Sequence, residues 1–284
     1  MLSVFQALIL GLVQGISELF PISSLGHSVI IPSLVGWHLD QQDPVFITFI
    51  VVTHIATALV LFLFFFADWK LILQGLGRSL RTREIRQDDT YARIGWLLIV
   101  SSVPVGILGI LFEKQFSMLF AIPLYAGYFL IGNGIVLYIA EWFIHRRPIQ
   151  ESHSYERVAH LSWIEAIKIG LVQCLALLPG FSRTGATLAG SLMVGLSHED
   201  AARYAFLLAT PIIFAAGVLK IPELVLSGEA VNMMIFVVGA GAAALGAYVS
   251  VRFLTRYFKT HTLIPFAYYC AAVGLITICV SLLH

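Results

Sequence analysis

The chain has 284 residues, of which 59% are hydrophobic and only 12% are charged, whereas soluble domains carry about 25% charged residues. Its mean hydropathy is +0.90 and its apolar residues come in long blocks, so we expect an integral membrane protein and not a soluble domain. The net charge of +1, with basic residues confined to loops, gives no reason to expect a nucleic-acid partner.

The first segment, residues 1–36, contains the stretch GLVQGISELFPISSLGH, which places polar and ionisable groups in apolar surroundings. Such groups are costly inside a membrane and usually serve function. Only 11 residues, Gly26 to Gly36, follow the serines before the polar WHLDQQDP turn. As a helix they cover roughly 17 Å, about half a bilayer. We therefore expect 1–36 to form a re-entrant helical hairpin.

Six later blocks are apolar and have about the length that a membrane-crossing helix needs, roughly 20 residues. We expect transmembrane helices over Pro44–Phe66, Ile94–Phe112, Ala121–Ala140, Ala201–Leu219, Val231–Val251 and Thr262–Leu283. The Phe62–Phe66 run, with Trp69, is interpreted as lipid-facing and interfacial.

A second polar stretch, GLVQCLALLPGFSRTGAT over Gly170 to Thr187, repeats the first about half a chain later. Both begin with Gly-Leu-Val-Gln, and both continue through a proline and a serine to a glycine and a short apolar arm. Because that arm, Gly185 to Gly195, is equally short, we expect residues 161–196 to form a second re-entrant hairpin.

The charges of the loops decide how the chain threads the membrane. Several basic residues lie between Ala67 and Ile94 and between Ala140 and Leu161, and basic residues in short loops stay in the cytoplasm. If neither hairpin makes a net crossing, Arg252, Arg256 and Lys259 also fall in a cytoplasmic loop. The hairpin interpretation is therefore favoured over full crossings.

Each half then holds one hairpin and three crossings, so the second half enters the membrane upside down. We predict an all-α integral membrane protein with an inverted-topology repeat, six transmembrane helices and two re-entrant hairpins. The first repeat is 1–141 and the second is 161–284, within one membrane domain over 1–284. The hairpin tips are expected to meet near the midplane and to build a site there.

The residues at the tips favour an anionic ligand. The short arms are expected to begin just after Ser24 and after Thr184, so two helix N-termini would point at the junction. Arg183 can grip phosphate oxygens in bidentate fashion. Gln14 and Glu18, four residues apart, share a helix face directed at the same place. Together these groups indicate a phosphate or diphosphate site.

Other polar residues allow both a functional and a structural interpretation. His27, one helical turn after Ser24, can exchange protons near neutral pH, but a lone histidine can also satisfy a neighbouring carbonyl. Gln14 recurs as Gln173, so a structural role is as plausible as a catalytic one. For His54, in the middle of a predicted span, an interhelical hydrogen bond is favoured over a place in the cavity.

The two motifs resemble signatures of a known family. GLVQGISELFPISSLGH is similar to the (E/Q)xxxE plus PxSSxGH signature, and PGFSRTGAT to the PGxSRSxxT signature, of the undecaprenyl-diphosphatase family of bacitracin-resistance membrane phosphatases. The resemblance covers nearly the whole chain. It implies removal of the terminal phosphate from a C55 polyprenyl diphosphate, which recycles the lipid carrier for cell-wall synthesis, at the outer side of the bacterial inner membrane.

The resemblance also implies roles for individual residues. Ser24 would be the nucleophile, Arg183 the phosphate clamp and Glu18 the main acid/base or cation-binding carboxylate. His27 would donate or accept a proton. The substrate-binding positions would be Gln14, Ser23, Gly26, Ser182, Thr184, Gly185 and Thr187.

The chain departs from the commonest family pattern at three positions. Gln14 stands where glutamate is frequent, Leu25 replaces a threonine, and Thr184 replaces a serine. The family resemblance alone implies a Mg²⁺ or Ca²⁺ requirement, with Glu18 the best candidate ligand.

Three alternatives stay open at this point. Activated water could attack the phosphate in place of Ser24, and the chain could be a monomer or a homodimer. A transporter or flippase of phosphorylated polyprenyl lipid is the competing function, because inverted repeats with midplane sites are common among carriers.

Overall fold

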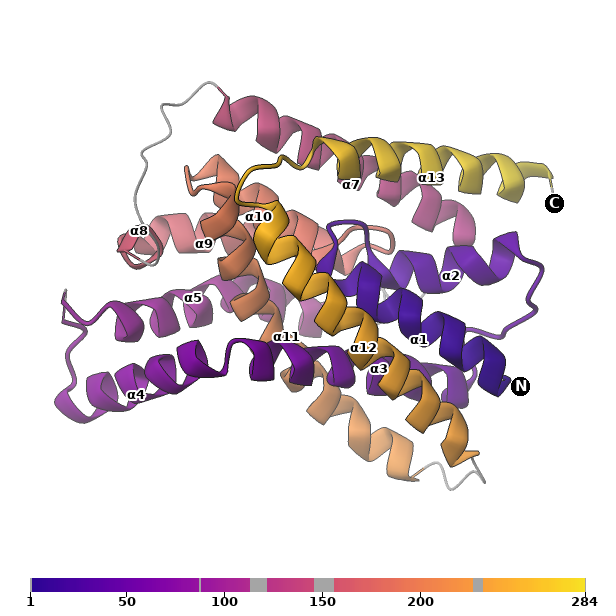
Figure 1. The fold of residues 1–284 in the computed structure, drawn as a ribbon, viewed down its shortest axis with the longest axis horizontal. Helices are drawn as coiled ribbons and strands as arrows, with labels where there is room; N and C mark the ends of the chain where they lie inside the picture. Colours follow the sequence, from indigo (N-terminus) through magenta and orange to yellow (C-terminus); the bar gives the residue numbers. More distant parts are fainter. Residues whose placement is uncertain (1, 87, 113–121, 146–155, 227–231, 284) are drawn as a thin grey trace.

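A computed structural model describes residues 2–86, 88–112, 122–145, 156–226 and 232–283. Throughout these ranges the regular structure is helical (Figure 1). The helices are α1 (Val4–Leu19), α2 (Ser24–Leu34), α3 (Pro44–Phe64), α4 (Phe66–Thr82), α5 (Thr90–Leu111), α7 (Pro123–Ile144), α8 (Glu156–Ala159), α9 (Trp163–Gln173), the 3₁₀ turn η1 (Cys174–Leu177), α10 (Arg183–Met193), α11 (His198–Leu226), α12 (Met233–Tyr257) and α13 (Ile264–Leu283).

Five helices of the described chain, α3, α5, α7, α12 and α13, are long and apolar enough to cross a membrane, and they coincide with five of the six predicted spans. The predicted span Ala201–Leu219 lies inside α11, which is 29 residues long but is not among the five. Its first turn carries Glu199 and Asp200, and Tyr204 and Phe206 are fully buried. The all-helical, multi-pass prediction is confirmed.

Both predicted hairpins have a helix–turn–helix form. In the first, α1 begins with a capping box in which Ser3 and Gln6 satisfy each other's backbone amides, and α2 returns after a four-residue turn. In the second, α9 tightens into η1 before α10 returns. The returning arms, α2 and α10, have 11 residues each, which is about half a membrane thickness. The inversion of 1–141 relative to 161–284 stays a prediction.

Small residues let the long arm of the first hairpin lie directly against α12. A side chain at Gly11 would collide with the backbone of Gly239, and one at Gly15 would lie 2.8 Å from the backbone nitrogen of Ala247. Such close approach of two backbones is how membrane helices gain packing energy. In the second hairpin α9 packs on α5 in the same way, with Gly170 against Pro104.

The segment after α3 differs from the sequence-based expectation. Residues 67–82, which the sequence assigns to a loop, form with Phe66 the helix α4, an amphipathic helix that packs on α5. Phe65 and Trp69 are buried in the core rather than facing lipid. The buried carboxylate of Asp68 accepts two hydrogen bonds from Nη2 of Arg203, each 3.0 Å long. Core packing and this ion pair therefore hold α4 against the bundle.

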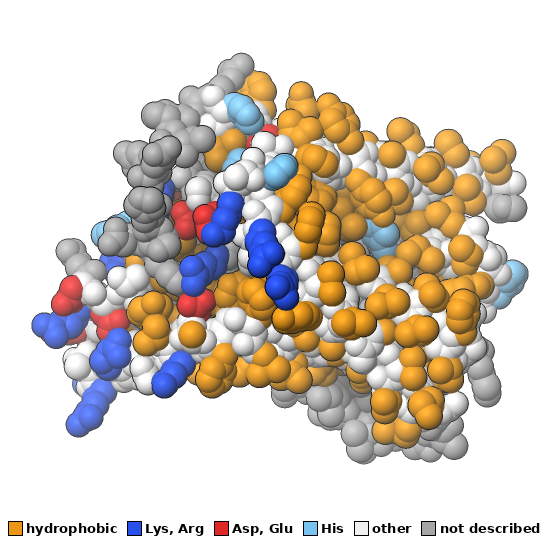
Figure 2. Space-filling view, in the orientation of Figure 1, with side chains coloured by type: hydrophobic (Ala, Val, Ile, Leu, Met, Phe, Trp, Pro, Cys, Tyr) orange, Lys and Arg blue, Asp and Glu red, His pale blue; other side chains and the backbone are white. Residues whose placement is uncertain are grey.

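The exterior separates into an apolar part and a charged part (Figure 2). Hydrophobic side chains cover the right-hand part of the visible face, and lysines, arginines and acidic residues gather toward its left. Large apolar side chains on the candidate spans are exposed, among them Ile110, Val237 and Leu275. Exposed apolar surface of this extent is typical of a lipid-contacting face.

Candidate functional site

The tips of the two hairpins touch each other, as the repeat predicts. Thr184 Oγ1 donates a 2.8 Å hydrogen bond to the carbonyl oxygen of Glu18, and Ser182 Oγ donates one of 3.3 Å to that of Phe20. A Cβ atom built on Gly26 would lie 3.2 Å from Cα of Gly180. Groups that are about 160 residues apart in sequence therefore form one continuous junction.

Both returning helices begin at this junction with a serine cap. Ser23 Oγ accepts a 3.2 Å hydrogen bond from the amide of Gly26, and Ser182 Oγ accepts one of 3.0 Å from the amide of Gly185. The first residues of the two helices are thus Ser24 and Arg183, one or two positions earlier than expected. Ser23 and Ser182 are structural equivalents, although the sequence motifs align Ser182 with Ser24.

The backbone at Ser23 lies in an unusual region. Its φ is 69°, and non-glycine residues rarely adopt positive φ because of clashes with Cβ. Conformations of this kind cost about 1–3 kcal/mol and cluster at functional sites. The strained residue directly precedes Ser24, whose hydroxyl the turn directs at the carboxylate of Glu18.

The carboxylate of Glu18 is the centre of the site. Its Oε2 accepts hydrogen bonds from Ser24 Oγ and, at 3.1 Å, from Gln14 Nε2. Oε2 also lies 3.2 Å from Nε2 of His54, and Oε1 lies 3.8 Å from Nη1 of Arg183. With its side chain only 5% exposed, Glu18 is the buried negative charge that these cationic and polar groups balance.

A small cavity opens beside this carboxylate. Its free volume is about 20 Å³, which is space for one or two water molecules. It is lined by Glu18, Ser23, Ser24, Leu25, His54, Ala176, Phe181, Ser182 and Arg183. Within the described chain, Nη1 of Arg183 is buried without a hydrogen-bond partner, so this donor remains available to a ligand oxygen.

The sequence-predicted residues fall into two groups around the cavity. Five line it directly: Glu18, Ser23, Ser24, Ser182 and Arg183. The others support it, since Gln14 bonds Glu18, Thr184 ties the tips, and the amides of Gly26 and Gly185 bond the capping serines. Thr187 is buried on α10, one turn after Arg183, outside the cavity lining.

His27 faces away from the cavity. Its Nδ1 is 2.6 Å from the carbonyl oxygen of Ser23, and its Nε2 is 2.8 Å from the hydroxyl of Tyr269 on α13. The imidazole stacks on the Tyr269 ring with centroids 5.7 Å apart. These contacts tie the strained turn to α13, so His27 holds the backbone that precedes Ser24.

His54 lines the cavity, a position that sequence reasoning ranks below an interhelical hydrogen bond, and its contact with Glu18 of α1 is also interhelical. From the middle of α3 its Nε2 reaches Glu18, and its Nδ1 is 2.7 Å from the carbonyl oxygen of Ile50. Each ring nitrogen therefore lies within hydrogen-bond distance of an oxygen. The available signal was an ionisable side chain at the centre of an apolar span.

Asn133 on α7 is a second residue that sequence reasoning missed. Its Nδ2 donates a 2.8 Å hydrogen bond to the carbonyl oxygen of Pro21, and its Oδ1 accepts one of 3.1 Å from the amide of Ser182. Asn133 is completely buried and joins one hairpin tip to the other. The signal was a carboxamide within an otherwise apolar span, GNGIV.

The donor set limits which metal ion the site can hold. In the described ranges no three His, Cys, Asp or Glu side chains gather as metal ligands. Glu18 offers a carboxylate, and the buried Oε1 of Gln14 has no hydrogen-bond partner among the described residues. Nε2 of Gln14 faces Glu18 in the structure, so the two residues fit an ion such as Mg²⁺ when the carboxamide turns its oxygen toward the carboxylate; water and substrate phosphates would supply the remaining ligands.

Comparison with known proteins gives full-length similarity. The chain is 45% identical to an undecaprenyl-diphosphatase of Mycolicibacterium paratuberculosis, over 96% of this chain and 95% of that protein. It is 42% identical to undecaprenyl-diphosphatase 2 of Chromobacterium violaceum, over 97% of this chain and 98% of that protein. The bacitracin resistance protein BacA family matches residues 7–276. The chain therefore belongs to the BacA family of bacitracin resistance proteins.

Proposed function

We propose that the protein is a membrane phosphatase that hydrolyses undecaprenyl diphosphate to undecaprenyl monophosphate and inorganic phosphate. The observation that carries the proposal is the arrangement at the hairpin junction, where Ser24, Glu18 and Arg183 line one cavity. The names of the full-length relatives support this substrate and favour hydrolysis over transport. The product is the lipid carrier for cell-wall synthesis, and its regeneration is the basis of bacitracin resistance.

The site is arranged to hold a diphosphate. Arg183 lines the cavity, and its Nη1 pairs with Glu18 at 3.8 Å but has no hydrogen-bond partner among the described residues, so the guanidinium can bind phosphate oxygens there. The N-termini of α2 and α10 flank it, and their unpaired amides and dipoles favour an anion. Phosphoryl transfer depends mainly on such positioning and charge neutralisation. The hydroxyls of Ser23 and Ser182 line the same cavity.

The chemical step begins at Ser24. Its hydroxyl oxygen attacks the terminal phosphorus while its proton passes to Glu18, with which it already shares a hydrogen bond. The bond from that phosphorus to the bridging oxygen breaks, and the oxygen leaves as part of undecaprenyl monophosphate. Water then attacks the phosphoserine, which returns the hydroxyl to Ser24 and releases inorganic phosphate. In the alternative route, Glu18 activates water for direct attack and Ser24 only positions the carboxylate.

Neighbouring residues prepare these groups for reaction. Arg183 places a positive charge beside Glu18, and His54 lies within hydrogen-bond distance of the same carboxylate; the guanidinium favours an anionic substrate in the same space. His27 holds the turn before Ser24 in place by contacting the Ser23 carbonyl oxygen and the Tyr269 hydroxyl. A proton exchanged by His27 would pass along these two contacts. Thr187 supports α10 behind Arg183.

A divalent cation is part of the proposal. Glu18 and Gln14 would hold Mg²⁺ or Ca²⁺, which would neutralise phosphate charge when bound. Gln14 contributes a neutral oxygen where a second carboxylate would bind more strongly, so the ion would depend on the substrate for much of its coordination.

Entry of the substrate requires the junction to widen. A cavity of about 20 Å³ is too small for a diphosphate, since ligand sites commonly exceed about 300 Å³. The apolar side chains of Leu25, Ala176 and Phe181 form the non-polar part of its wall and suit the first isoprene units. We place the protein in the bacterial inner membrane with this cavity opening to the outer side.

Phosphate release by the purified protein in detergent tests the proposal. We expect release from C55 and C15 diphosphates, its suppression by EDTA, and near-complete loss in Arg183→Gln. The matched control is Arg81→Gln, which removes a positive charge from the exposed end of α4. A folded wild-type protein that binds the diphosphate without releasing phosphate would refute hydrolysis. The transport function would then remain, and it would have to be measured in vesicles because transport needs two compartments.

A further inference from the structure

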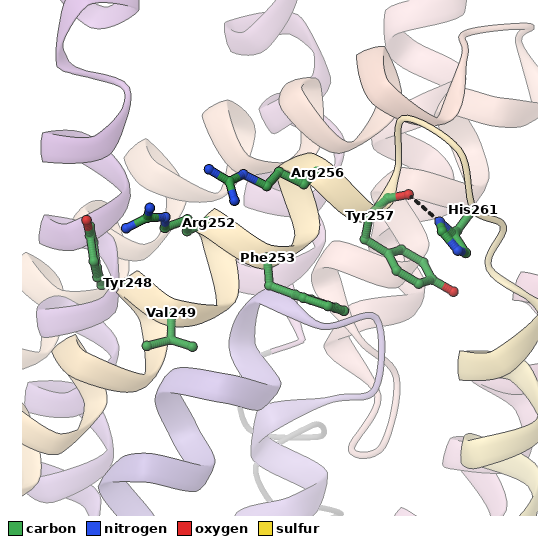
Figure 3. A pocket seen from close by; sticks show the side chains of 7 residues that line it. All are labelled: Tyr248, Val249, Arg252, Phe253, Arg256, Tyr257 and His261. Carbon is green, nitrogen blue, oxygen red and sulfur yellow. Dashed lines mark hydrogen bonds between the residues drawn. The ribbon is translucent and has the colours of Figure 1, made fainter.

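A second concave site lies away from the hairpin junction. An open groove of about 520 Å³ follows the last turns of α12 and the loop to α13 (Figure 3). Its main lining residues are Tyr248, Arg252, Phe253, Arg256, Tyr257 and His261. None of them lines the cavity at Glu18. A volume of this size is within the range of sites for small molecules, about 300–1,000 Å³.

Two arginines give the groove its charge. Arg252 and Arg256 are one helical turn apart, are exposed, and extend from the same side of α12 (Figure 3). Within the described chain neither guanidinium group forms an ion pair or a hydrogen bond, whereas the carbonyl oxygens of both residues accept one. The nearby Lys259 differs, because its Nζ lies 3.4 Å from Oε1 of Glu199. The groove thus holds two positive charges that the described residues leave unbalanced.

Aromatic rings form the other wall of the groove. Phe253 stacks on Phe20 of the first hairpin with centroids 5.9 Å apart and an 8° angle between the rings. Tyr257 stacks on His261 at 4.6 Å. Both rings lie on the side of α12 away from the guanidinium groups (Figure 3). This wall is fixed by contacts with the hairpin and the loop, so the groove is preformed.

Toward the N-terminus of α12, the groove continues into apolar surface. Val249 is 57% exposed and Leu245, one turn earlier, is 60% exposed. In Figure 2 a row of basic side chains borders the area covered by hydrophobic ones. A ligand in the groove would therefore meet guanidinium groups at one end and lipid-facing side chains at the other. This is the polarity of a phospholipid.

We propose that this groove binds an anionic membrane phospholipid, with its phosphodiester between Arg252 and Arg256 and an acyl chain along Val249 and Leu245. Guanidinium groups bind phosphate oxygens through paired hydrogen bonds. Basic residues at the end of a membrane helix attract anionic lipids. A zwitterionic headgroup adds a positive charge beside the two arginines and binds more weakly. This site is separate from the proposed catalytic function and does not depend on it.

Native mass spectrometry of the detergent-solubilised full chain tests the proposal by measuring the dissociation constant of the first bound lipid. The probes are dioleoylphosphatidylglycerol and dioleoylphosphatidylcholine. We expect the wild type to prefer the anionic lipid. Each arginine should contribute about fivefold, so Arg252→Gln/Arg256→Gln should lose on the order of 25-fold in affinity for phosphatidylglycerol with little change for phosphatidylcholine.

The matched control is Arg81→Gln/Arg83→Gln, which removes two exposed charges from the end of α4 and should leave the preference intact. If both double variants lose affinity equally, the effect is diffuse surface charge and the groove is not the site. Equal affinity of the wild type for both lipids would also overturn the proposal. Should the double variant fail to fold, Arg252→Gln alone decides by the presence or absence of its fivefold loss.

Discussion

Replacing Ser24 with alanine separates the two chemical routes that the site allows. In the structure the hydroxyl of Ser24 donates a hydrogen bond to Oε2 of Glu18. Oε2 of Glu18 also contacts Gln14 and His54, so the Glu18 carboxylate keeps these two partners when Ser24 is replaced. We expect the fold to survive Ser24→Ala with little change in thermal stability.

The expected loss of activity depends on what Ser24 does. If it is the nucleophile, its removal abolishes the covalent route and should lower kcat by about 10³-fold or more. If water attacks directly, Ser24 contributes one hydrogen bond to a charged group. Such bonds contribute about 1.5–3 kcal/mol, which corresponds to a loss of roughly 10- to 100-fold. The two mechanisms therefore predict different magnitudes.

The assay is phosphate release at saturating diphosphate, with Ser28→Ala as the control. Ser28 is also buried on α2, but its hydroxyl bonds the carbonyl oxygen of Leu25 within the same helix. Acid quenching during turnover should in addition trap phosphate on Ser24 in the wild type. A folded Ser24→Ala variant that keeps more than about a hundredth of wild-type kcat would refute the serine-nucleophile route.

Four further substitutions probe the surroundings of the site. His54→Gln keeps one donor toward Glu18 but no positive charge, and should lower kcat by ~10- to 100-fold in the phosphate assay without loss of folded protein. Gly15→Leu forces a side chain into the backbone of α12 and should destabilise the fold by ~1–3 kcal/mol or more; Gly241→Leu, whose site is open, should not shift the melting temperature. Asn133→Leu leaves the buried amide of Ser182 without its partner and the carbonyl oxygen of Pro21 with only the weak bond from Cys270 Sγ; this should cost ~1–3 kcal/mol, and unchanged thermal unfolding would contradict its role in joining the tips. Gln14→Glu should lower the Mg²⁺ concentration at half-maximal activity, because a second carboxylate strengthens the cation site.

The sequence predicts the hairpins well because their evidence is local. Length alone shows that Gly26–Gly36 cannot cross a bilayer, and the repeated motif points to a second copy. The junction of the tips followed from the predicted inversion, and the contacts of Ser182 and Thr184 with the first hairpin agree with it. Of Glu18 and the four side chains that contact its carboxylate, the motifs named all but His54, namely Glu18, Ser24, Arg183 and Gln14.

What the sequence could not give depends on packing between distant segments. His54 is 36 positions from Glu18, and Asn133 is 49 from Ser182; no spacing rule relates such pairs. His27 was placed near Ser24 correctly, but the direction of its ring depends on Tyr269, 242 positions away. From the sequence, the α4 segment is assigned to a loop because of its basic residues, although they lie on an amphipathic helix. That helix is held by the ion pair between its Asp68 and Arg203 of α11, a contact between distant segments.

The two sides of the junction between the hairpin tips contribute different kinds of hydrogen-bonding group. Apart from the Glu18–Arg183 ion pair, the first hairpin contributes main-chain oxygens to the contacts across the junction, those of Glu18, Phe20 and Pro21, and the donors are the side chains of Thr184, Ser182 and Asn133. Main-chain oxygens persist whatever residue carries them. Evolution is therefore free to vary the ring at position 20 while the fastening holds, but has little such latitude on the donor side. A saturation-mutagenesis library should therefore tolerate many substitutions at position 20 but few at Ser182, Thr184 and Asn133.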